Sequence, residues 1–543
     1  MSIYKFSNPM DTAYSHFATE EEFEKASVVV KEDDIHPKNA GGVMMDMGNG
    51  RVAMGREELH SFVIGESGCG KTRRIVIPTV DMVSRCGKES LVIADPKGEI
   101  YEATAETLKK RGYTVHRINF TDPFSSNKWN PLEFTAKTYG KGGRLEARGR
   151  NLLRETLNVM KTSVHSERDL FWEEQGGKLI YGICMLILKY GNPEDLTFRN
   201  VSYNLKKILS NNEVFTELYN EFPNDSEEKE YLTPICPGQD ERTTFSVKMT
   251  AEGMLDAFCS DDQLLSLFDS SDFDITELGR KKTALFLILS DSSKALYPIA
   301  TVLIKELYTL LLDEADSSEE KRLKMPVFFI LDEFANFTKI PDADSMLSAA
   351  RSRGIRFMLV CQSMRQLHEK YGNNAAEILM SNCRIWIYMN SRDIGFLERL
   401  STIMGESKSK YTGEKERLVG ISELQHLEDG EVIVLNDRCY PMRGYLKDYS
   451  EYCHFDKPVI SESCSDDSEL LVPAIYSIDL LESWRKRSIA ESERELEYDD
   501  EVDDDGEISE YMKEMQATIE QYQPVIMEYL EQRKKEEDED IPF

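Results

Sequence analysis

The sequence predicts an α/β fold in which a mostly parallel central sheet is covered by helices and interrupted by an all-helical region. Two observations lead to this prediction. Short apolar runs alternate with helical runs between residues 61 and 134, which is the rhythm of parallel βαβ units. Comparable strand-like runs return between residues 283 and 437, whereas residues 140–265 show apolar positions at helical spacing and few strand signals.

The strand and helix signals can be placed in chain order. Glycine-rich turns at 41–42 and 47–50 separate two short predicted strands near the N-terminus. The predicted strands are 43–47, 51–55, 61–64, the first part of the run 91–99 before its turn at 95–99, 113–120, 283–291, 326–334, 356–363, 384–390 and 431–437. The later strands are nearly continuous in apolar character, which predicts burial on both faces. The predicted helices are 73–83, 101–111, 144–160, 171–191, 196–210, 344–352, 375–380, 470–488 and 510–535, with a solvated acidic run at 498–509.

These signals predict four regions. They are an N-terminal segment (1–55), a discontinuous nucleotide-binding domain (56–140 and 266–455), an all-α domain (141–265) and an acidic, partly disordered C-terminal region (456–543). The alternative for residues 141–265 is that their helices belong to one larger domain.

Composition restricts the class of protein. The 543 residues, 41% of them hydrophobic, are enough for several buried cores. Ten cysteines form no C-x-x-C pair, so reduced thiols are expected rather than zinc or disulfides. The N-terminus lacks the apolar core of a signal peptide. The most apolar helical run, 295–312, contains Lys305 and Glu306, which favours a buried core helix over a membrane span.

Charge is unevenly distributed. About half of the net charge of −32 falls on residues 491–543. This balance argues against a surface that coats nucleic acid without specificity, although it leaves room for a local basic channel.

The motif G-x-x-x-x-G-K-[ST] occurs at residues 65–72, directly after a predicted strand. Its residues are Gly65, Glu66, Ser67, Gly68, Cys69, Gly70, Lys71 and Thr72. The glycines let backbone N–H groups face a triphosphate, Lys71 reaches its β- and γ-phosphates, and the Thr72 hydroxyl binds Mg²⁺. The following helix contains Pro78, which limits its regularity. The alternative is a glycine-rich turn with an incidental lysine.

A second motif, an apolar strand that ends in Asp332-Glu333, predicts hydrolysis. Asp332 would hold Mg²⁺ directly or through water, and Glu333 would orient and deprotonate the attacking water. Open α/β sheets bind ligands at the carboxyl ends of their strands, so the strand ends at 64, 331 and 361 are expected to meet. The sequence lacks a complete guanine-reading Asn-Lys-x-Asp motif, since 127–130 read Asn-Lys-Trp-Asn. An adenine nucleotide is therefore favoured by elimination.

Three further features have more than one interpretation. Gln362, at a strand end, is suited to sensing the γ-phosphate, or is a turn residue. Arginines at 351–356 are suited to reaching a neighbouring subunit's ATP or a DNA phosphate, or form a solvated turn. Asp95-Pro96-Lys97-Gly98-Glu99 predicts a fixed turn that exposes one cation between two carboxylates.

Together these segments resemble the type IV secretion coupling proteins, the ATPases that bring DNA to a conjugation channel. The resemblance spans about residues 60–440. It rests on GESGCGKT (65–72), IADPKGEIYEATAETLKKRGYTVHRINF (93–120), WNPLEF (129–134), DLFWEEQGGKLI (169–180), FFILDEFANFTKIP (329–341) and RSRGIRFMLVCQSMRQLHEKYG (351–372).

The resemblance implies a RecA-like P-loop motor with an inserted all-α domain that recognises cargo. It implies ATP and Mg²⁺ as cofactors and hexameric rings with ATP between subunits. Gln362 is similar to the family's sensor glutamine and Arg351 to its trans-acting arginine. The implied partners are single-stranded DNA, a relaxase and the type IV secretion channel.

One departure from the family is the lack of N-terminal membrane helices in this sequence. Either the chain is a soluble member at the cytoplasmic face of the membrane that docks on a separate membrane subunit, or its N-terminus is trimmed. The acidic tail is either a contact for a basic partner or a solubilising segment. Two other functions stay open: a double-stranded DNA translocase of the chromosome-segregation type, and a cargo adaptor that binds ATP without hydrolysing it.

Overall fold

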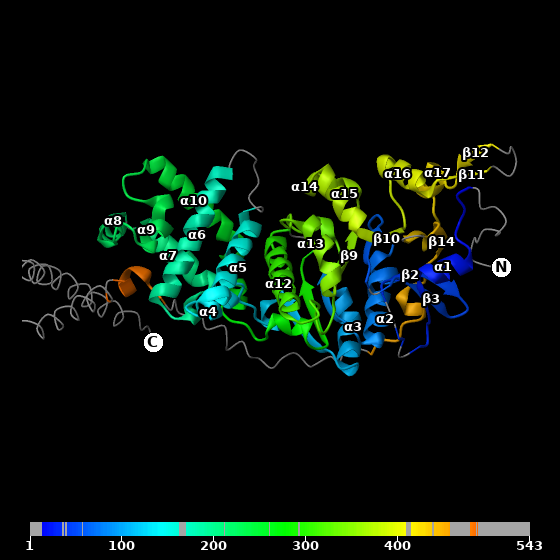
Figure 1. Cartoon of the computed structure of the whole chain (residues 1–543), viewed down its shortest axis with the longest axis horizontal. Helices are drawn as coiled ribbons and strands as arrows, with labels where there is room; N and C mark the ends of the chain where they lie inside the picture. Colours follow the sequence, from blue (N-terminus) through cyan, green and yellow to red (C-terminus); the bar gives the residue numbers. More distant parts are fainter. Residues whose placement is uncertain are drawn as a thin grey trace, which may run out of the picture. The chain divides into compact units, whose positions relative to one another are not determined.

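The structure is a computed structural model that describes residues 14–484 and 486, apart from 35–36, 39–40, 57, 162–169, 211, 260, 291–293, 409–413, 437–438 and 457–477. The chain forms two compact units, Met1–Leu481 and Glu482–Phe543. The sheet and the helices labelled in Figure 1 belong to the first unit. Within the predicted helix 470–488, the described residues 480–484 and 486 are helical; the predicted acidic run and the predicted terminal helix lie outside the described residues.

Twelve strands of the described residues form one sheet, in the order β1-β3-β2-β14-β13-β10-β4-β9-β8-β5-β7-β6. The strands are β1 (Val28–Lys31), β2 (Val43–Gly48), β3 (Arg51–Met54), β4 (His60–Ile64), β5 (Ser90–Asp95), β6 (Thr114–Asn119), β7 (Thr283–Ile288), β8 (Val327–Leu331), β9 (Ile355–Cys361), β10 (Cys383–Tyr388), β13 (Glu431–Asn436) and β14 (Met442–Tyr445). A separate hairpin joins β11 (Glu406–Lys408) and β12 (Lys415–Arg417).

The sheet has a parallel part and an antiparallel part. From β10 to β6 all neighbours are parallel, which confirms the mostly parallel sheet that the apolar strands predict. β13 runs antiparallel to β10, and β14, β2, β3 and β1 continue in antiparallel pairs. The N-terminal strands therefore extend the same sheet, at the edge next to β14.

The antiparallel part begins with a hairpin between β2 and β3. Asn49 and Gly50 both have positive φ, at 54° and 68°, as the tight turns of two-residue hairpins require. This confirms the turn that the sequence predicts at 47–50.

The helix after the phosphate-binding loop is less regular than the predicted single helix. Thr72–Val76 form a π-helical turn in which the N–H of Ile77 donates to the Thr72 carbonyl, and α2 (Ile77–Cys86) follows. Pro78, in the first turn of α2, has no N–H with which to continue an α-helical pattern. The prediction that Pro78 limits the regularity of this helix is confirmed. The irregularity is the π-helical turn at Thr72–Val76, which is wider than an α-helical turn.

Between β6 and β7 every described regular element is helical. These are α4 (Glu133–Thr138), α5 (Gly143–Lys161), α6 (Leu170–Tyr190), α7 (Phe198–Ser210), α8 (Asn212–Glu221), α9 (Glu227–Leu232), α10 (Glu241–Cys259) and α11 (Asp262–Leu267), with short 3₁₀ turns. Figure 1 shows α5, α6, α7 and α10 gathered as a bundle. Gly176 lets α6 approach α10 closely, since a Cβ there would stand 3.1 Å from the Ala251 backbone nitrogen.

The remaining helices cover the sheet and its loops. They are α1 (Glu20–Ala26), α3 (Glu99–Lys110), α12 (Tyr297–Ser317), α13 (Ala343–Ala350), α14 (Met364–Tyr371), α15 (Asn373–Asn382), α16 (Ile394–Met404) and α17 (Ile421–Gln425). None of the described helices combines the length and apolar character that a membrane crossing requires.

Helix α12 is the buried core helix that the sequence predicts. Its Glu306 is 3% exposed and accepts a hydrogen bond of 3.0 Å from Trp129 Nε1. Burial raises the pKa of Glu306 well above its usual range. The helix also binds α5, because Arg148 donates to Asp313 at 2.8 Å and Thr309 donates to Glu155 at 2.7 Å.

Candidate nucleotide-binding site

The phosphate-binding loop lies at the carboxyl end of β4, between the neighbouring strands β9 and β10. Gly68 and Gly70 have φ values of 83° and 87°, in the left-handed region where a side chain is strained. The loop is tied to both neighbours. The Gly65 N–H donates to the Cys361 carbonyl at 3.2 Å, and the Glu66 N–H donates to Asn390 Oδ1 at 2.8 Å.

Lys71 is held inside this loop. Its ammonium group donates to the carbonyls of Gly65 at 2.6 Å and Glu66 at 3.1 Å, and the residue is 6% exposed. Cys69 packs its Sγ 3.7 Å from Met389 Sδ, and burial raises the pKa of its thiol. Ser67 and Gly68, by contrast, are exposed at the outer turn. The eight predicted loop residues thus form one continuous loop with the lysine at its centre.

Thr72 and Asp332 come together although 260 residues separate them. The Thr72 hydroxyl donates to Asp332 Oδ2 at 2.8 Å. Asp332 is 4% exposed, and burial, with the Glu333 carboxylate as a second cause, raises its pKa to about 6. A buried carboxylate beside a hydroxyl is a pair of hard oxygen donors that suits Mg²⁺.

The rest of the coordination would come from phosphates and water. Among the residues that the structure describes, no three His, Cys, Asp or Glu side chains gather as a metal cluster. That arrangement fits Mg²⁺, which proteins usually bind through one or two side chains together with substrate phosphates.

Glu333 and Gln362 also meet. Glu333 has φ 55° and ψ 39°, an unusual backbone conformation for a residue other than glycine, of the kind that functional sites retain. Gln362 Nε2 donates to Glu333 Oε1 at 2.6 Å, since the strands that carry them, β8 and β9, are neighbours. The predicted water-activating acid and the predicted sensor therefore hold each other in place.

Arg351 lies elsewhere. It belongs to a 3₁₀ turn, Arg351–Arg353, before the amino end of β9, whereas Gln362 follows the carboxyl end. A seven-residue strand rises by about 20 Å, so this distance separates Arg351 from the loop of its own chain. Among the three arginines of this stretch, Arg353 donates to Asp316 at 3.2 Å and Arg356 donates to Glu89 at 2.9 Å. Arg351 is exposed and has no such partner among the described residues.

Asp95 is a residue whose place the sequence does not reveal. The predicted turn has Lys97 exposed as expected, but Asp95 is fully buried rather than exposed beside it. It follows Ala94, which pairs with Leu331, so Asp95 and Asp332 end neighbouring strands. Burial raises the pKa of Asp95 to about 7 despite the hydrogen bond from the Tyr101 N–H, and the charge of Asp332 contributes. The signal in the sequence that could have pointed to Asp95 is the presence of a carboxylate at the end of a predicted strand.

Lys370 is a second such residue. From α14 its ammonium group donates to the carbonyls of Ala335, at 2.6 Å, and Phe337. These carbonyls belong to the loop that follows Glu333. Burial lowers the pKa of Lys370 to about 8, and the charge of Lys294 contributes. Lys370 thus fixes the loop that carries the acid, and no local motif marks it.

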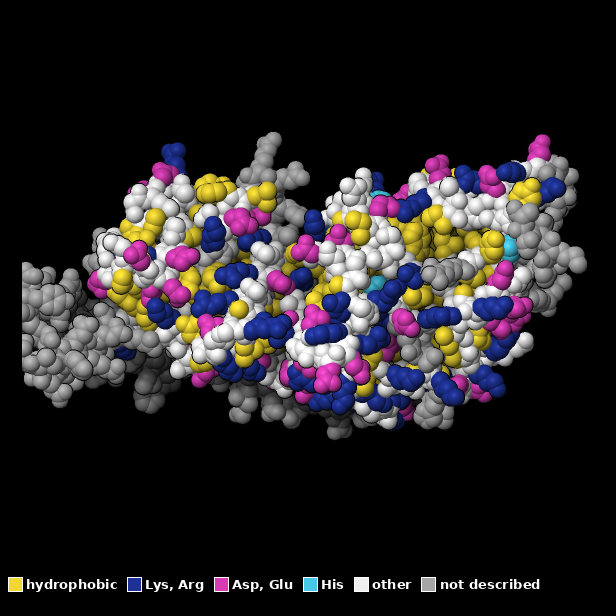
Figure 2. All heavy atoms as spheres, viewed as in Figure 1, with side chains coloured by type: hydrophobic (Ala, Val, Ile, Leu, Met, Phe, Trp, Pro, Cys, Tyr) yellow, Lys and Arg dark blue, Asp and Glu magenta, His cyan; other side chains and the backbone are white. Residues whose placement is uncertain are grey.

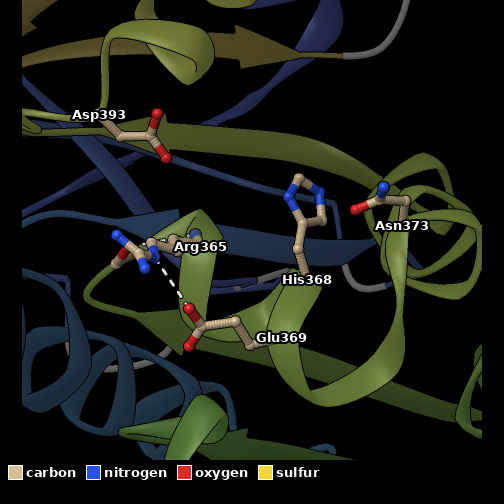
Figure 3. Close-up of a pocket in the computed structure, with 6 residues that line it drawn as sticks. Arg365, His368, Glu369, Asn373 and Asp393 are labelled. Atoms are coloured by element: carbon tan, nitrogen blue, oxygen red, sulfur yellow. Dashed lines mark hydrogen bonds and ion pairs between the residues drawn. The ribbon is translucent and has the colours of Figure 1, made fainter.

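A polar pocket of about 580 Å³ lies beside the loop (Figure 3). Its lining comes from the segments after β9 and β10, the two strands that flank β4, and consists of Ser363, Arg365, His368, Glu369, Asn373 and Asp393. Arg365 pairs with Glu369 at 2.8 Å within it. The polar pocket therefore lies at the same edge of the sheet as the phosphate-binding loop, and the side chains that line it can form hydrogen bonds.

The fold and this arrangement of residues define a class. A phosphate-binding loop after β4, an acidic pair after β8 and a glutamine after the intervening strand β9 are the features of a RecA-like P-loop ATPase fold. The structure of the coupling protein TrwB lacking its first 70 residues has the same fold, with a TM-score of 0.59 at 17% identity over 84% of this chain and 98% of that one. TrwB with the ATP analogue ADPNP matches with a TM-score of 0.58.

Within that class, the sequence identifies the family. Residues 10–420 match the family model described as Type IV secretory system Conjugative DNA transfer, and the chain belongs to this family. Protein VirD4 of Rhizobium radiobacter is 25% identical over 64% of this chain and 48% of its own length. Conjugal transfer protein TraG of Escherichia coli is 24% identical over 72% of this chain and 62% of its own length. The chain thus spans about half to three fifths of these relatives.

Proposed function

We propose that this chain is an ATP-hydrolysing coupling protein that delivers single-stranded DNA, with its relaxase, to a type IV secretion channel. The observation that carries the proposal is the connected set of side chains at the carboxyl edge of the sheet. Thr72 bonds Asp332, Glu333 follows Asp332 directly, and Glu333 bonds Gln362, all beside the loop that holds Lys71.

Each residue has a distinct task in hydrolysis. The loop N–H groups and Lys71 bind the phosphates of ATP. Thr72 and Asp332 would hold Mg²⁺, which when bound neutralises charge on the β- and γ-phosphates. Glu333 orients a water molecule and accepts its proton, and Gln362 keeps that carboxylate in position.

The position of Arg351 supports an arrangement of several subunits. Because about 20 Å of strand separates Arg351 from the loop of its own chain, a role for it in hydrolysis requires a nucleotide that another copy holds. A ring in which each copy supplies Arg351 to its neighbour satisfies this requirement, and we expect a hexamer at the cytoplasmic face of the membrane, attached through a separate membrane subunit. We assign the motor to residues 56–140 and 266–455, and cargo recognition to 141–265.

The decisive experiment compares the purified chain with a Glu333→Gln variant. We expect kcat for ATP to fall at least ~100-fold, as for other general bases. Binding of a fluorescent ATP analogue should persist, because Glu333 contacts water rather than the phosphates. Glu194→Gln, which removes an exposed carboxylate in the helical region between β6 and β7, is the control and should leave kcat unchanged.

Nucleic acid distinguishes the remaining candidates. Stimulation of the wild-type rate by single-stranded DNA supports the proposal, whereas stimulation by duplex DNA alone indicates a chromosome-segregation type of pump. ATP binding without turnover, equal in wild type and Glu333→Gln, indicates a non-hydrolysing adaptor.

A further inference from the structure

A cationic hollow of about 290 Å³ lies at the amino ends of the central strands, opposite the phosphate-binding loop. Its charged lining comes from the segments that precede β4, β5, β8 and β9 and from the start of β9 itself, and consists of Glu58, Lys88, Glu89, Arg322, Arg351 and, within β9, Arg356. Four cations thus face two carboxylates in a chain whose net charge is −32. A local excess of positive charge here attracts anions.

Two of these cations are already engaged within the fold. Arg356 is 3% exposed and forms a buried ion pair with Glu89. Lys88 donates to the Lys38 carbonyl. Arg356 and Lys88 therefore line the hollow, but their charged groups are already bound within the fold and are not available to a ligand.

Arg322 and Arg351 are the two that face outward. Both are exposed, and neither guanidinium bonds a carboxylate among the described residues. The adjacent Arg353, in contrast, pairs with Asp316. An exposed guanidinium retains all its donors for a planar, bidentate contact with a phosphate.

The backbone fixes Arg322 beside Arg351. The N–H of Leu323 donates to the Arg353 carbonyl at 2.9 Å, and the N–H of Val327 donates to the Gly354 carbonyl at 2.9 Å. Gly354 has φ 82°, and a Cβ there would stand 3.3 Å from Arg322 Cγ and 3.4 Å from its Nε. Glycine at 354 therefore permits the turn after Arg351 and also lets the Arg322 side chain lie across it.

We infer that Arg322 and Arg351 form one two-guanidinium site for the triphosphate end of a nucleotide held by a second copy of this chain. The inference rests on the proposed function, in which Arg351 acts across a subunit boundary, and it adds Arg322 as a further residue in contact with the reacting phosphate. Two guanidinium groups can divide the charge that develops on the phosphate oxygens during transfer.

The test mixes two inactive or weakly active variants whose intact residues can form a complete site only across the boundary between two subunits. Arg322→Ala and Lys71→Ala chains carrying different tags are coexpressed, and mixed assemblies are purified through both tags. In a ring of random order, about a quarter of the boundaries join an intact loop to an intact arginine pair, so ATPase activity should return to up to about a quarter of the wild-type rate, with the full quarter expected only if neighbouring copies act independently. A chain carrying both substitutions, coexpressed with Arg353→Ala, is the matched control: about a quarter of its sites are intact if the arginines act across the boundary, and about half if they act within one chain.

Single variants define the expected effects. Arg351→Ala should lower kcat by about 10³-fold or more, as for other trans-acting arginines. Arg322→Ala should lower kcat by about 10- to 100-fold, with partial rescue by Arg322→Lys, because a lysine restores charge but not the bidentate contact. Nucleotide affinity of isolated Arg322→Ala subunits should equal that of wild type. Arg353→Ala, whose guanidinium pairs with Asp316, should retain wild-type kcat.

Three outcomes overturn the inference. If Arg351→Ala is repaired by Lys71→Ala but Arg322→Ala is not, Arg322 has no role across the boundary while the proposed function stands. If Arg322→Ala keeps its basal rate and loses only stimulation by single-stranded DNA, the hollow binds nucleic acid instead. If no combination, wild type included, hydrolyses ATP, the proposed function itself fails.

Discussion

Replacing Asp332 with asparagine tests how the fold holds the carboxylate that we propose binds Mg²⁺. Burial and the Glu333 carboxylate raise the pKa of Asp332 from 3.8 to about 6. The folded chain therefore binds this proton more tightly than the unfolded chain, and ionisation above about pH 6 destabilises the folded state. A difference of about 2 pH units corresponds to ~3 kcal/mol, as an upper limit for the cost at neutral pH.

Asparagine removes that cost and one hydrogen bond. Its volume matches that of aspartate, but its one amide oxygen can accept from only one of the two donors that Asp332 binds, the Thr72 hydroxyl at 2.8 Å and the Glu333 N–H at 3.0 Å. The lost hydrogen bond costs about 1 kcal/mol, which is less than the cost of the buried charge. In metal-free buffer at about pH 7.5, Asp332→Asn should therefore melt at a higher temperature than wild type. The advantage should shrink as the pH falls from about 6 to about 4, where the wild-type carboxyl is protonated in both states.

The assay is thermal melting followed by fluorescence, with EDTA and again with ADP and Mg²⁺. Wild type should gain stability from ADP and Mg²⁺ by mass action, whereas Asp332→Asn should gain much less. If Asp332→Asn melts below wild type in EDTA at about pH 7.5, the carboxylate is compensated in the folded chain and the reasoning from burial is wrong.

Three further substitutions have defined outcomes. Gly70→Ala places a side chain at φ 87°, which costs ~1–2 kcal/mol, and should abolish binding of a fluorescent ATP analogue. Lys370→Met removes the donor that fixes the loop after Glu333, so kcat should fall further than nucleotide affinity in steady-state and binding assays. Glu306→Gln keeps an acceptor for Trp129 Nε1 and removes a buried acid whose raised pKa disfavours its charged form. At about pH 8 it should therefore melt at or above the wild-type temperature, and the difference should vanish only below the usual glutamate pKa of 4.5.

The parallel half of the fold could be predicted because its signals are local. Each central strand is a short apolar run, and the loop at 65–72 and the pair Asp332-Glu333 are contiguous motifs. The sequence order of these motifs was enough to expect their meeting, since carboxyl ends of parallel strands share one edge.

The features that the sequence did not reveal depend on partners far along the chain. No local sequence pattern near residues 431–436 predicts that β13 runs antiparallel to β10. None predicts that β2 joins the same sheet through β14. Burial of Asp95 requires β8, which lies more than 230 residues further along the chain.

The arginines at 351–356 show the same limit. As a sequence they are one basic run. Asp316 and Glu89, which pair with Arg353 and Arg356, come from distant segments, and only their positions leave Arg351 available. Charge counts cannot make that distinction, and on the face that Figure 2 shows, basic and acidic side chains are interspersed.

The seven residues of β9 have a consequence for timing. Arg351 stands before the strand and Gln362 stands after it, with every strand residue buried. In a ring, Arg351 at the amino end of β9 would contact the nucleotide of the neighbouring copy. Gln362 at the carboxyl end would lie beside the nucleotide that its own chain binds. Loss of the γ-phosphate from the nucleotide at one end of β9 can then displace the residue at the other end. Neighbouring copies would therefore hydrolyse ATP one after another around the ring instead of independently.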